Sequence, residues 1–346
     1  MRKIIFLGCI FFSFLACKKE PVTSHPLSKN TTDTNRWATI WKNDITNFIA
    51  ISFSNRDTGF VELYNDTILR QCILATHDGG KTWTKNICNF TNSSYEYGNY
   101  TLKSVDNIIF LHKDSALYKS VDNGINWAKL GISFYGGESN DCYYPIDSSH
   151  ILLRAWQALL LSSNGGKSWA DSVLLLYYDG LNVHNFSFIS DKIGFFIADE
   201  NSEINSQFIK KTTDGGQTWV SLNTPIPFDR LQFVTEKVGY GFTDGWNNTD
   251  NKWILYKTTD GGQNWQTVYQ LPANTYWNDV HFINADTGYY YTPYKIYCTM
   301  DGGKTWGVDF TLKGAPAYVY ITDWSFAKTG EAYVITNWGR IIKKMY

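Results

Sequence analysis

The sequence predicts an all-β fold, a single β-propeller of seven blades. Three observations lead to it: an eight-residue phrase occurs six times, a second strand pattern precedes most of its copies, and no segment of useful length reads as a helix. The third residues of the six phrases lie 44, 42, 50, 46 and 41 residues apart. Self-similarity at such a period is typical of propellers and solenoids.

The repeated phrase starts with Ser or Thr, has Asp or Asn in third place and glycine in fifth place, and ends in Trp. This order predicts a tight turn, because the side-chain oxygen accepts hydrogen bonds from the backbone N–H groups ahead of it and glycine adopts positive φ. The tryptophan then begins the next strand and offers a large apolar face to a neighbour. The third and eighth residues are Asp78 and Trp83, Asp122 and Trp127, Asn164 and Trp169, Asp214 and Trp219, Asp260 and Trp265, and Asp301 and Trp306.

The phrase resembles the Asp-box, also called the BNR repeat, of sialidases, sortilin-type receptors and the photosystem II stability/assembly factor family. In those families the box is a structural turn between the third and fourth strands of a blade, away from the active face. The resemblance therefore implies a structural role for the six positions. Asn164 agrees with this role, since a turn tolerates an amide at this position, whereas catalysis by a carboxylate would not. The likeness to the assembly-factor propellers covers nearly the whole mature chain and rests on the boxes and the blade pattern.

A second pattern precedes most of the boxes: a strand that ends in Phe, followed six residues later by Gly and an aromatic residue. It starts at Phe53, Phe188, Phe233 and Phe282, and we interpret it as an inner strand, a tight turn and a second strand. Each blade then runs through strands A, B and C, the box turn and strand D. The expected blades are 46–90, 100–131, 141–176, 183–222, 230–271 and 276–312.

Blade seven is expected to be split between the two ends of the chain. Residues 318–326 read as its strand A and 332–336 as its strand B, and 340–344 match the strand before the fourth box. A shortened box at 31–37, followed by 38–41, supplies the missing turn and fourth strand. The N-terminal strand would thus complete the C-terminal blade, which removes the gap at which the ring would otherwise stay open.

The first 16 residues read as an export signal. Arg2 and Lys3 precede an apolar run of 13 residues, too short to span a bilayer. The run ends in Phe-Leu-Ala before Cys17, which resembles the lipobox of bacterial lipoproteins, and the following Lys-Lys-Glu resembles surface lipoproteins of the Bacteroidetes. The resemblance implies a lipid on Cys17, a flexible tether over 17–35 and a propeller over 36–346, in an exported protein of the outer membrane that faces the periplasm or the surface. An ordinary secretory signal is the alternative.

Charge and motif content argue against several classes of function. Without Arg2 and Lys3 the chain has 29 basic and 32 acidic residues, a net charge of about −3, whereas a nucleic-acid surface would be basic. The six histidines show no metal-ligand spacing, and the sequence has no Cys-x-x-Cys, phosphate loop or nucleotide fingerprint. We therefore expect no metal, no cofactor and no nucleic-acid partner.

The loops that join strand D to strand A, and strand B to strand C, share the end of the propeller opposite the boxes. Here they are rich in aromatic residues, Tyr294 among them, which suits a peptide or glycan surface. Such residues can equally pack between blades. The predicted contact residues are Tyr95, Tyr97, Trp156, Trp246, Trp277 and Trp338.

A glycosidase is the alternative, since sialidases and xyloglucan-hydrolysing enzymes carry the same boxes. Sialidases need three clustered arginines and an early Phe/Tyr-Arg-Ile-Pro signature, which is absent here. Of the seven arginines, Arg154 and Arg230 are placed to approach the loop face. A hydrolase with a carboxylate pair stays open, and its candidate residues are Glu138, Asp141, Asp179, Asp199 and Glu200.

Cys72 and Cys88 are predicted to form a disulfide. Residue numbers across an antiparallel hairpin add to a constant, and the first box sets this constant near 159, so the two cysteines would face each other on strands C and D. An exported protein reaches a compartment oxidising enough for such a bond.

The sequence thus favours a non-catalytic, membrane-anchored propeller that recognises a protein or glycan partner in the cell envelope, in an assembly or scaffold role. No nucleophile, metal or cofactor motif stands out. A rigid ring on a lipid tether would hold its aromatic loops away from the membrane, where they could meet that partner.

Overall fold

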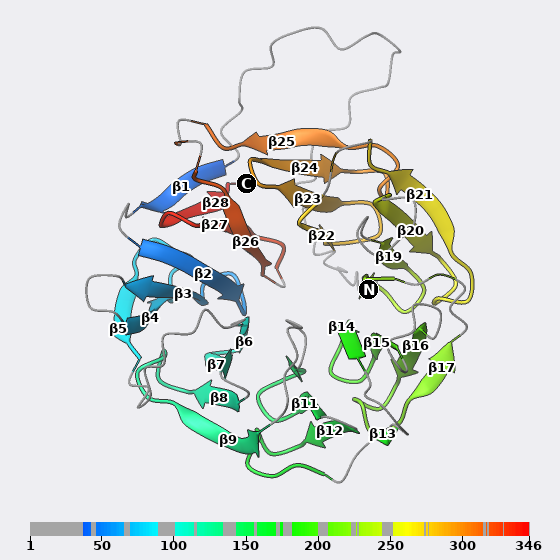
Figure 1. The fold of residues 1–346 in the computed structure, drawn as a ribbon, viewed down its shortest axis with the longest axis horizontal. Coiled ribbons are helices and arrows are strands. Elements are labelled where there is room, and N and C mark those ends of the chain that lie inside the picture. The colour runs from blue at the N-terminus through cyan, green and yellow to red at the C-terminus, as the bar shows by residue number, and fades with distance from the viewer. Residues whose placement is uncertain are drawn as a thin grey trace, which may run out of the picture.

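Seven four-stranded sheets make up this protein and stand around one central axis (Figure 1). The computed structural model describes residues 37–42, 46–65, 70–88, 101–113, 116–133, 143–155, 158–170, 174–175, 182–199, 207–222, 226, 228–243, 252–272, 275, 277–313, 316, 318–327 and 329–345. The regular secondary structure of these residues is entirely β, and the predicted seven-bladed propeller is confirmed. The described part of the chain contains no helix long and apolar enough to cross a membrane. The export signal, Cys17 and the tether lie outside it.

Strands β2 to β28 run in chain order from the first blade to the seventh, and β1 is the fourth strand of the seventh. Their bounds are β2 (Thr46–Phe53), β3 (Gly59–Asn65), β4 (Arg70–Thr76) and β5 (Thr84–Ile87) in blade 1; β6 (Thr101–Val105), β7 (Ile108–Lys113), β8 (Ala116–Ser120) and β9 (Ala128–Ser133) in blade 2; β10 (Tyr143–Pro145), β11 (Ile151–Ala155), β12 (Ala158–Ser162) and β13 (Leu174–Leu175) in blade 3; β14 (Asn182–Phe188), β15 (Gly194–Asp199), β16 (Gln207–Thr212) and β17 (Val220–Leu222) in blade 4; β18 (Arg230–Phe233), β19 (Gly239–Thr243), β20 (Ile254–Thr258) and β21 (Gln266–Gln270) in blade 5; β22 (Asp279–Phe282), β23 (Gly288–Thr292), β24 (Lys295–Thr299) and β25 (Gly307–Thr311) in blade 6; and β26 (Ile321–Phe326), β27 (Ala332–Thr336), β28 (Arg340–Lys344) and β1 (Trp37–Lys42) in blade 7.

The hydrophobic core lies between the blades. Successive side chains of a strand point to opposite faces of its sheet, so each sheet buries one face against each neighbour. The described residues form seven core clusters, one in each seam between adjacent blades. Phe60 and Ile109, for example, meet between blades 1 and 2, and Leu152 and Phe196 meet between blades 3 and 4.

Strand β1 belongs to blade 7 although it comes from the other end of the chain (Figure 1). It pairs antiparallel with β28, with Trp37 opposite Lys344. Lys344 Nζ donates to Asp309 Oδ2 of blade 6 at 2.7 Å, and Trp37 Nε1 donates to the same oxygen at 2.8 Å. The side chains of Lys344 and Asp309 are only 3% and 8% exposed. Strands from both ends of the chain are therefore bonded to blade 6 through one buried carboxylate.

The six boxes form the turns between strands C and D. In the first box, Gly80 N donates to Thr76 Oγ1 and Thr82 N donates to Asp78 Oδ1, both at 2.9 Å. The same two bonds recur in the other five boxes. Asn164 keeps this geometry, because its oxygen accepts from Ser168 N and its Nδ2 donates to Ser168 Oγ. These side chains are thus occupied in shaping the turn.

Replacing Gly303 of the sixth box with alanine is expected to lower the free energy of unfolding by roughly 2–4 kcal/mol. Gly303 has φ +93°, and a Cβ there would lie 2.5 Å from Leu255 Cδ2 of blade 5. The change therefore adds backbone strain and overpacks a seam. Gly307→Ala is the control, since a Cβ at Gly307 meets no atom within 4 Å. Equal urea midpoints for the two variants would contradict this view of the box.

The register of β4 and β5 contradicts the expected disulfide. Cys72 stands opposite Ile87, and Cys88 donates its N–H to Gln71 O at 3.1 Å. Because neighbouring residues of a strand point to opposite faces, the two thiols lie on different sides of the sheet. Cys72 belongs to the core between blades 7 and 1, and Cys88 to the core between blades 1 and 2. The predicted Cys72–Cys88 bond is therefore wrong, and the structure holds both residues as cysteines outside a disulfide.

Candidate binding face

Two of the predicted contact residues, Trp277 and Trp338, belong to the described part of the chain. The remaining contact residues lie outside it: Tyr95, Tyr97, Trp156 and Trp246. The candidate catalytic carboxylates Glu138, Asp141, Asp179 and Glu200 also lie outside it, and only the backbone of Asp199 is described.

Trp277 is a core residue, contrary to the prediction that it is an exposed contact. Its side chain is 4% exposed. It meets the rings of Trp253 and Phe242 of blade 5 edge-on, and that of Tyr290 of blade 6 at 6.0 Å. It therefore packs in the seam between these two blades, because this position leads the chain from one sheet into the next.

Trp338 belongs to an exposed group of rings that we call the aromatic cluster: Tyr294, Tyr318, Tyr320 and Trp338. Their exposed fractions range from 39% to 56%. The rings of Tyr318 and Trp338 are 5.1 Å apart and tilted by 58°. Among the described Phe, Tyr and Trp residues, these four are the exposed ones. Large apolar side chains that stay together on a surface point to an interaction site.

The backbone under the aromatic cluster is fixed by hydrogen bonds. Asn337 Oδ1 accepts from Tyr320 N and Asn337 Nδ2 donates to Tyr318 O, both at 2.9 Å. Ile321 N donates to Pro293 O at 2.8 Å, which joins this segment to the loop that carries Tyr294. Hydrogen bonds thus join the backbone segments of blades 6 and 7 that carry the aromatic cluster, and a backbone ordered in this way lowers the entropy cost of binding in general.

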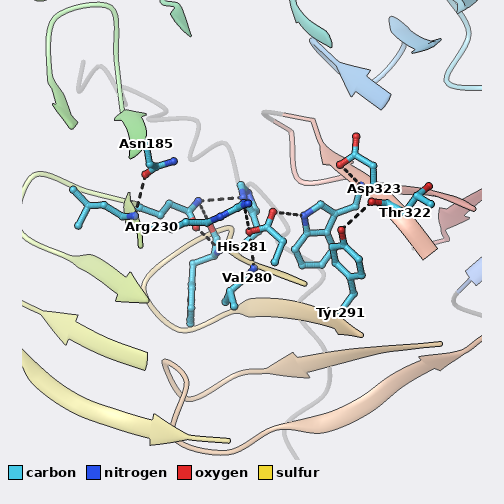
Figure 2. Close-up of polar contacts among 12 residues, drawn as sticks. Asn185, Arg230, Val280, His281, Tyr291, Thr322 and Asp323 are labelled. Atoms are coloured by element: carbon cyan, nitrogen blue, oxygen red, sulfur yellow. Dashed lines mark hydrogen bonds and ion pairs between the residues drawn. The ribbon is translucent and has the colours of Figure 1, made fainter. Parts of the chain in front are cut away.

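The first two strands of blades 5 to 7 carry a polar group that we call the inner-rim network: Arg230, Asp279, Asp323 and Trp324 on the inner strands, and Tyr291 on β23 (Figure 2). Arg230 Nη1 donates to Asp279 Oδ1 at 2.8 Å, and Trp324 Nε1 donates to Asp279 Oδ2 at 2.9 Å. Tyr291 Oη donates to the carbonyl of Thr322 at 3.1 Å. The network therefore connects three blades near the mouth of the ring.

Side chains of one inner strand also cap the free backbone edge of the next inner strand. Asp323 Oδ2 accepts from Ile51 N at 3.0 Å, and Gln232 Oε1 accepts from Phe282 N at 2.7 Å. Asn185 accepts in the same way from Leu231 N at 2.9 Å (Figure 2). An inner strand has a sheet partner on one side alone, so these caps satisfy N–H groups that would otherwise stay open.

Burial shifts the ionisation of several groups in this region. It raises the pKa of Asp323 to about 7, although the hydrogen bonds that its oxygens accept from two backbone N–H groups lower the pKa. Burial likewise raises the pKa of Tyr291, and the nearby charges of Asp323 and Asp279 act in the same direction. His281 stacks on Phe326 at 4.2 Å, and burial lowers its pKa to about 4. At neutral pH His281 is thus a neutral, packed side chain.

The titration of Asp323 predicts a pH-dependent stability difference between the protein and its Asp323→Asn variant. Its pKa rises from 3.8 unfolded to about 7 folded, so the carboxyl costs no stability below pH 4 and its cost grows as the pH rises to 7. The free energy of unfolding of the variant should therefore rise relative to that of the natural protein between pH 4 and 7, by on the order of 2–4 kcal/mol.

Urea unfolding at pH 4.5, 5.5, 6.5 and 7.5 measures this difference. His281 has the opposite effect, because its lowered pKa removes stability as the pH falls from 6.5 towards 4. Both proteins contain His281, so its contribution cancels when they are subtracted. A constant difference over the whole range would contradict the shift assigned to Asp323.

The sequence indicated one member of the inner-rim network, since Arg230 was expected near the loop face, and it missed Asp279, Tyr291 and Asp323. Asp279 and Arg230 are the first residues of their inner strands. A charged residue that opens the inner strand in two successive blades is a signal that could have found Asp279. The described residues contain no group of three His, Cys, Asp or Glu side chains that could hold a metal ion.

The sequence matches no protein-family model and no curated protein. The fold is similar to that of YCF48 bound to D1 peptide, with a TM-score of 0.65, 17% identity, and coverage of 92% of this chain and 100% of that one. It is also similar to the GH74 xyloglucanase from Xanthomonas campestris (TM-score 0.57, 14% identity, 84% and 51% coverage). A PL25 ulvan lyase with a bound glycan gives a TM-score of 0.54 at 11% identity, with 89% and 96% coverage. At such identities the similarity shows the fold.

Proposed function

We propose that this protein is a non-catalytic recognition propeller that binds a protein or glycan partner of the cell envelope through its aromatic cluster. In the same proposal, a lipid on Cys17 and the tether over 17–35 hold the ring at the outer membrane. The observation that carries the proposal is a set of exposed rings on hydrogen-bonded neighbouring segments of blades 6 and 7, Tyr294, Tyr318, Tyr320 and Trp338, of which Tyr318 and Trp338 are in ring contact. Rigid Tyr and Trp anchors are the residues that most often dominate binding energy at interfaces.

The similar structures support a binding role without naming the ligand. YCF48 was solved with a D1 peptide, and the ulvan lyase with a sulfated, uronate-containing glycan. Propellers of this shape thus bind extended polymers of either chemistry.

Replacing Trp338 with alanine is expected to weaken capture of the partner by about 30-fold, the factor that corresponds to a hot spot of about 2 kcal/mol. The measurement is recovery of co-purifying molecules from solubilised native envelope, titrated against immobilised protein. Met300→Ala is the control, because Met300 is 47% exposed but lies in the sixth box, on the opposite face of blade 6. Equal recovery by both variants, at unchanged melting temperature, would reject the aromatic cluster as the binding site.

A glycosidase is the second candidate, and one observation favours it. Asp279 and Asp323 interact electrostatically at the ring mouth, one paired with Arg230 and the other with a pKa raised to about 7, and unequal carboxyl groups suit acid–base hydrolysis. Their oxygens, however, already accept hydrogen bonds from Arg230, Trp324 and the backbone of blades 7 and 1. Turnover of xyloglucan, sialosides or aryl glycosides that is lost in Asp279→Asn would establish this candidate instead.

A further inference from the structure

Arg340 stands near the aromatic cluster, and none of the described residues pairs with its charge. It is the first residue of β28, two positions after Trp338. Its side chain shares a face of the sheet with that of Ile342, which packs against Tyr291 and Phe310 of blade 6. Arg340 therefore points to the side of blade 6, the blade that carries Tyr294.

The Arg340 guanidinium is poorly satisfied. Its Nε is buried and has no hydrogen-bond partner, and no described residue forms an ion pair with it. Arg56 and Arg230 differ in this respect, since they pair with Glu331 and Asp279. An arginine presents five donors in a fixed fork that matches a carboxylate, and a buried donor without an acceptor costs stability. Such a group is ready to receive an anionic ligand.

The surroundings carry positive charge and little negative charge. Lys295 is exposed and directly follows Tyr294. The described carboxylates of blades 6 and 7 are used elsewhere: Asp286, Asp301 and Glu331 lie in turns of the opposite face, Asp309 is bonded to Lys344, and Asp279 and Asp323 belong to the inner-rim network. A partner that meets the aromatic cluster thus meets two cations with it.

We infer that the partner presents an acidic polypeptide segment, whose carboxylates bind Arg340 and Lys295 while its apolar side chains pack on Tyr318, Tyr320 and Trp338. This inference rests on the proposed function and specifies its ligand. Trp, Tyr and Arg together are the usual composition of a protein hot spot. The rings of Tyr318 and Trp338 are tilted by 58°, so they do not form one flat platform on which successive sugar rings of a glycan chain could stack. The side-chain oxygen and nitrogen of Asn337, next to Trp338, both form hydrogen bonds with backbone atoms, so neither is directed at sugar hydroxyls.

The test uses an array of synthetic twelve-residue peptides that combine Asp or Glu with Leu or Phe, next to copies in which every acid is replaced by its amide. The full mature protein is expected to bind a subset of the acidic peptides at least tenfold more tightly than their amide copies, and to lose that preference at high salt. Arg340→Gln and Lys295→Gln should each weaken acidic-peptide binding about tenfold. Lys237→Gln, an exposed lysine of a turn on the opposite face, should leave it unchanged.

Arg340→Met keeps the inference falsifiable if another variant folds poorly. Because the guanidinium lacks partners, methionine should preserve the melting temperature while the preference for acidic peptides is lost. Binding of acidic and amide peptides with equal affinity, or retention of the preference in Arg340→Met, would overturn the inference. Binding of soluble polygalacturonate through the same two cations, without peptide binding, would overturn it in favour of an anionic glycan and leave the proposed function standing. Failure of the proposed function would appear separately, as unchanged partner recovery by Trp338→Ala.

Discussion

Removing residues 18–43 from a chain that begins at Cys17 is expected to lower the free energy of unfolding of the ring by roughly 5 kcal/mol, since two half-buried tryptophans are lost together and a fully buried aromatic side chain alone costs about 3–5 kcal/mol. The deletion takes away β1 with two tryptophans. Trp37 packs on Phe310 of blade 6 at 5.7 Å, and Trp41 packs on Phe48 of blade 1 at 5.1 Å. It also exposes the backbone edge of β28. One strand therefore supports three consecutive blades.

Deletion of residues 18–33 is the matched control, because it leaves β1 intact. Thermal melting followed by tryptophan fluorescence and far-UV circular dichroism should place this shorter deletion within a degree or two of the full mature chain. The longer deletion should melt many degrees lower and less cooperatively. Coincident melting of all three proteins would show that β1 contributes nothing to the stability of the ring.

Replacing Lys344 with methionine is expected to lower the free energy of unfolding by about 3–5 kcal/mol, the usual cost of leaving one buried charge without its partner. Lys344 and Asp309 are both almost fully buried, and the ammonium also donates to Tyr289 Oη at 2.9 Å. Methionine fills a similar volume, so the loss reports the uncompensated carboxylate of Asp309.

The double replacement Lys344→Met with Asp309→Leu separates charge from packing. Removing both charges should recover at least half of the stability that the single change loses, since no buried charge is then left, although Trp37 Nε1 loses its acceptor and Tyr289 Oη loses a donor. Lys295→Met controls for the loss of an exposed lysine and should leave the free energy of unfolding, measured with urea, within about 0.5 kcal/mol of that of the natural protein. A loss of stability in Lys344→Met as small as that in Lys295→Met would mean that water solvates the pair of Lys344 and Asp309.

The fold could be predicted because its signals are local and repeated. The Asp or Asn, the glycine and the Trp of each box predict a turn, and the spacing of the six copies predicts the length of a blade. Register is harder, because a shift of one residue moves a side chain to the other face of the sheet. Cys72 and Cys88 show this: a difference of one position in the hairpin separates two thiols that the sequence placed face to face.

The binding face was predicted in part because exposure depends on contacts between blades. Trp277 and Trp338 both lie in aromatic segments at the same end of the ring, and nothing near either residue in the chain distinguishes them. Trp277 meets the rings of a neighbouring blade, whereas Trp338 follows Asn337, which turns the chain outward. Asp279 and Asp323 escaped notice because their partners, Arg230 and Ile51, are 49 and 272 residues away.

The caps on the inner strands all run in one sense around the ring. Blade 4 caps blade 5, blade 5 caps blade 6, blade 7 caps blade 1, and blade 1 caps blade 2. Each blade thus has a distinct head and tail, as the subunits of a cyclic oligomer have, and such heterologous contacts close into a circle or continue as an open filament. Chain ends that meet within blade 7 select the circle. A molecule without β1 would keep the caps from blade 7 to blade 1, because they come from β26, but it would open the edge of β28, at which copies of the chain could join.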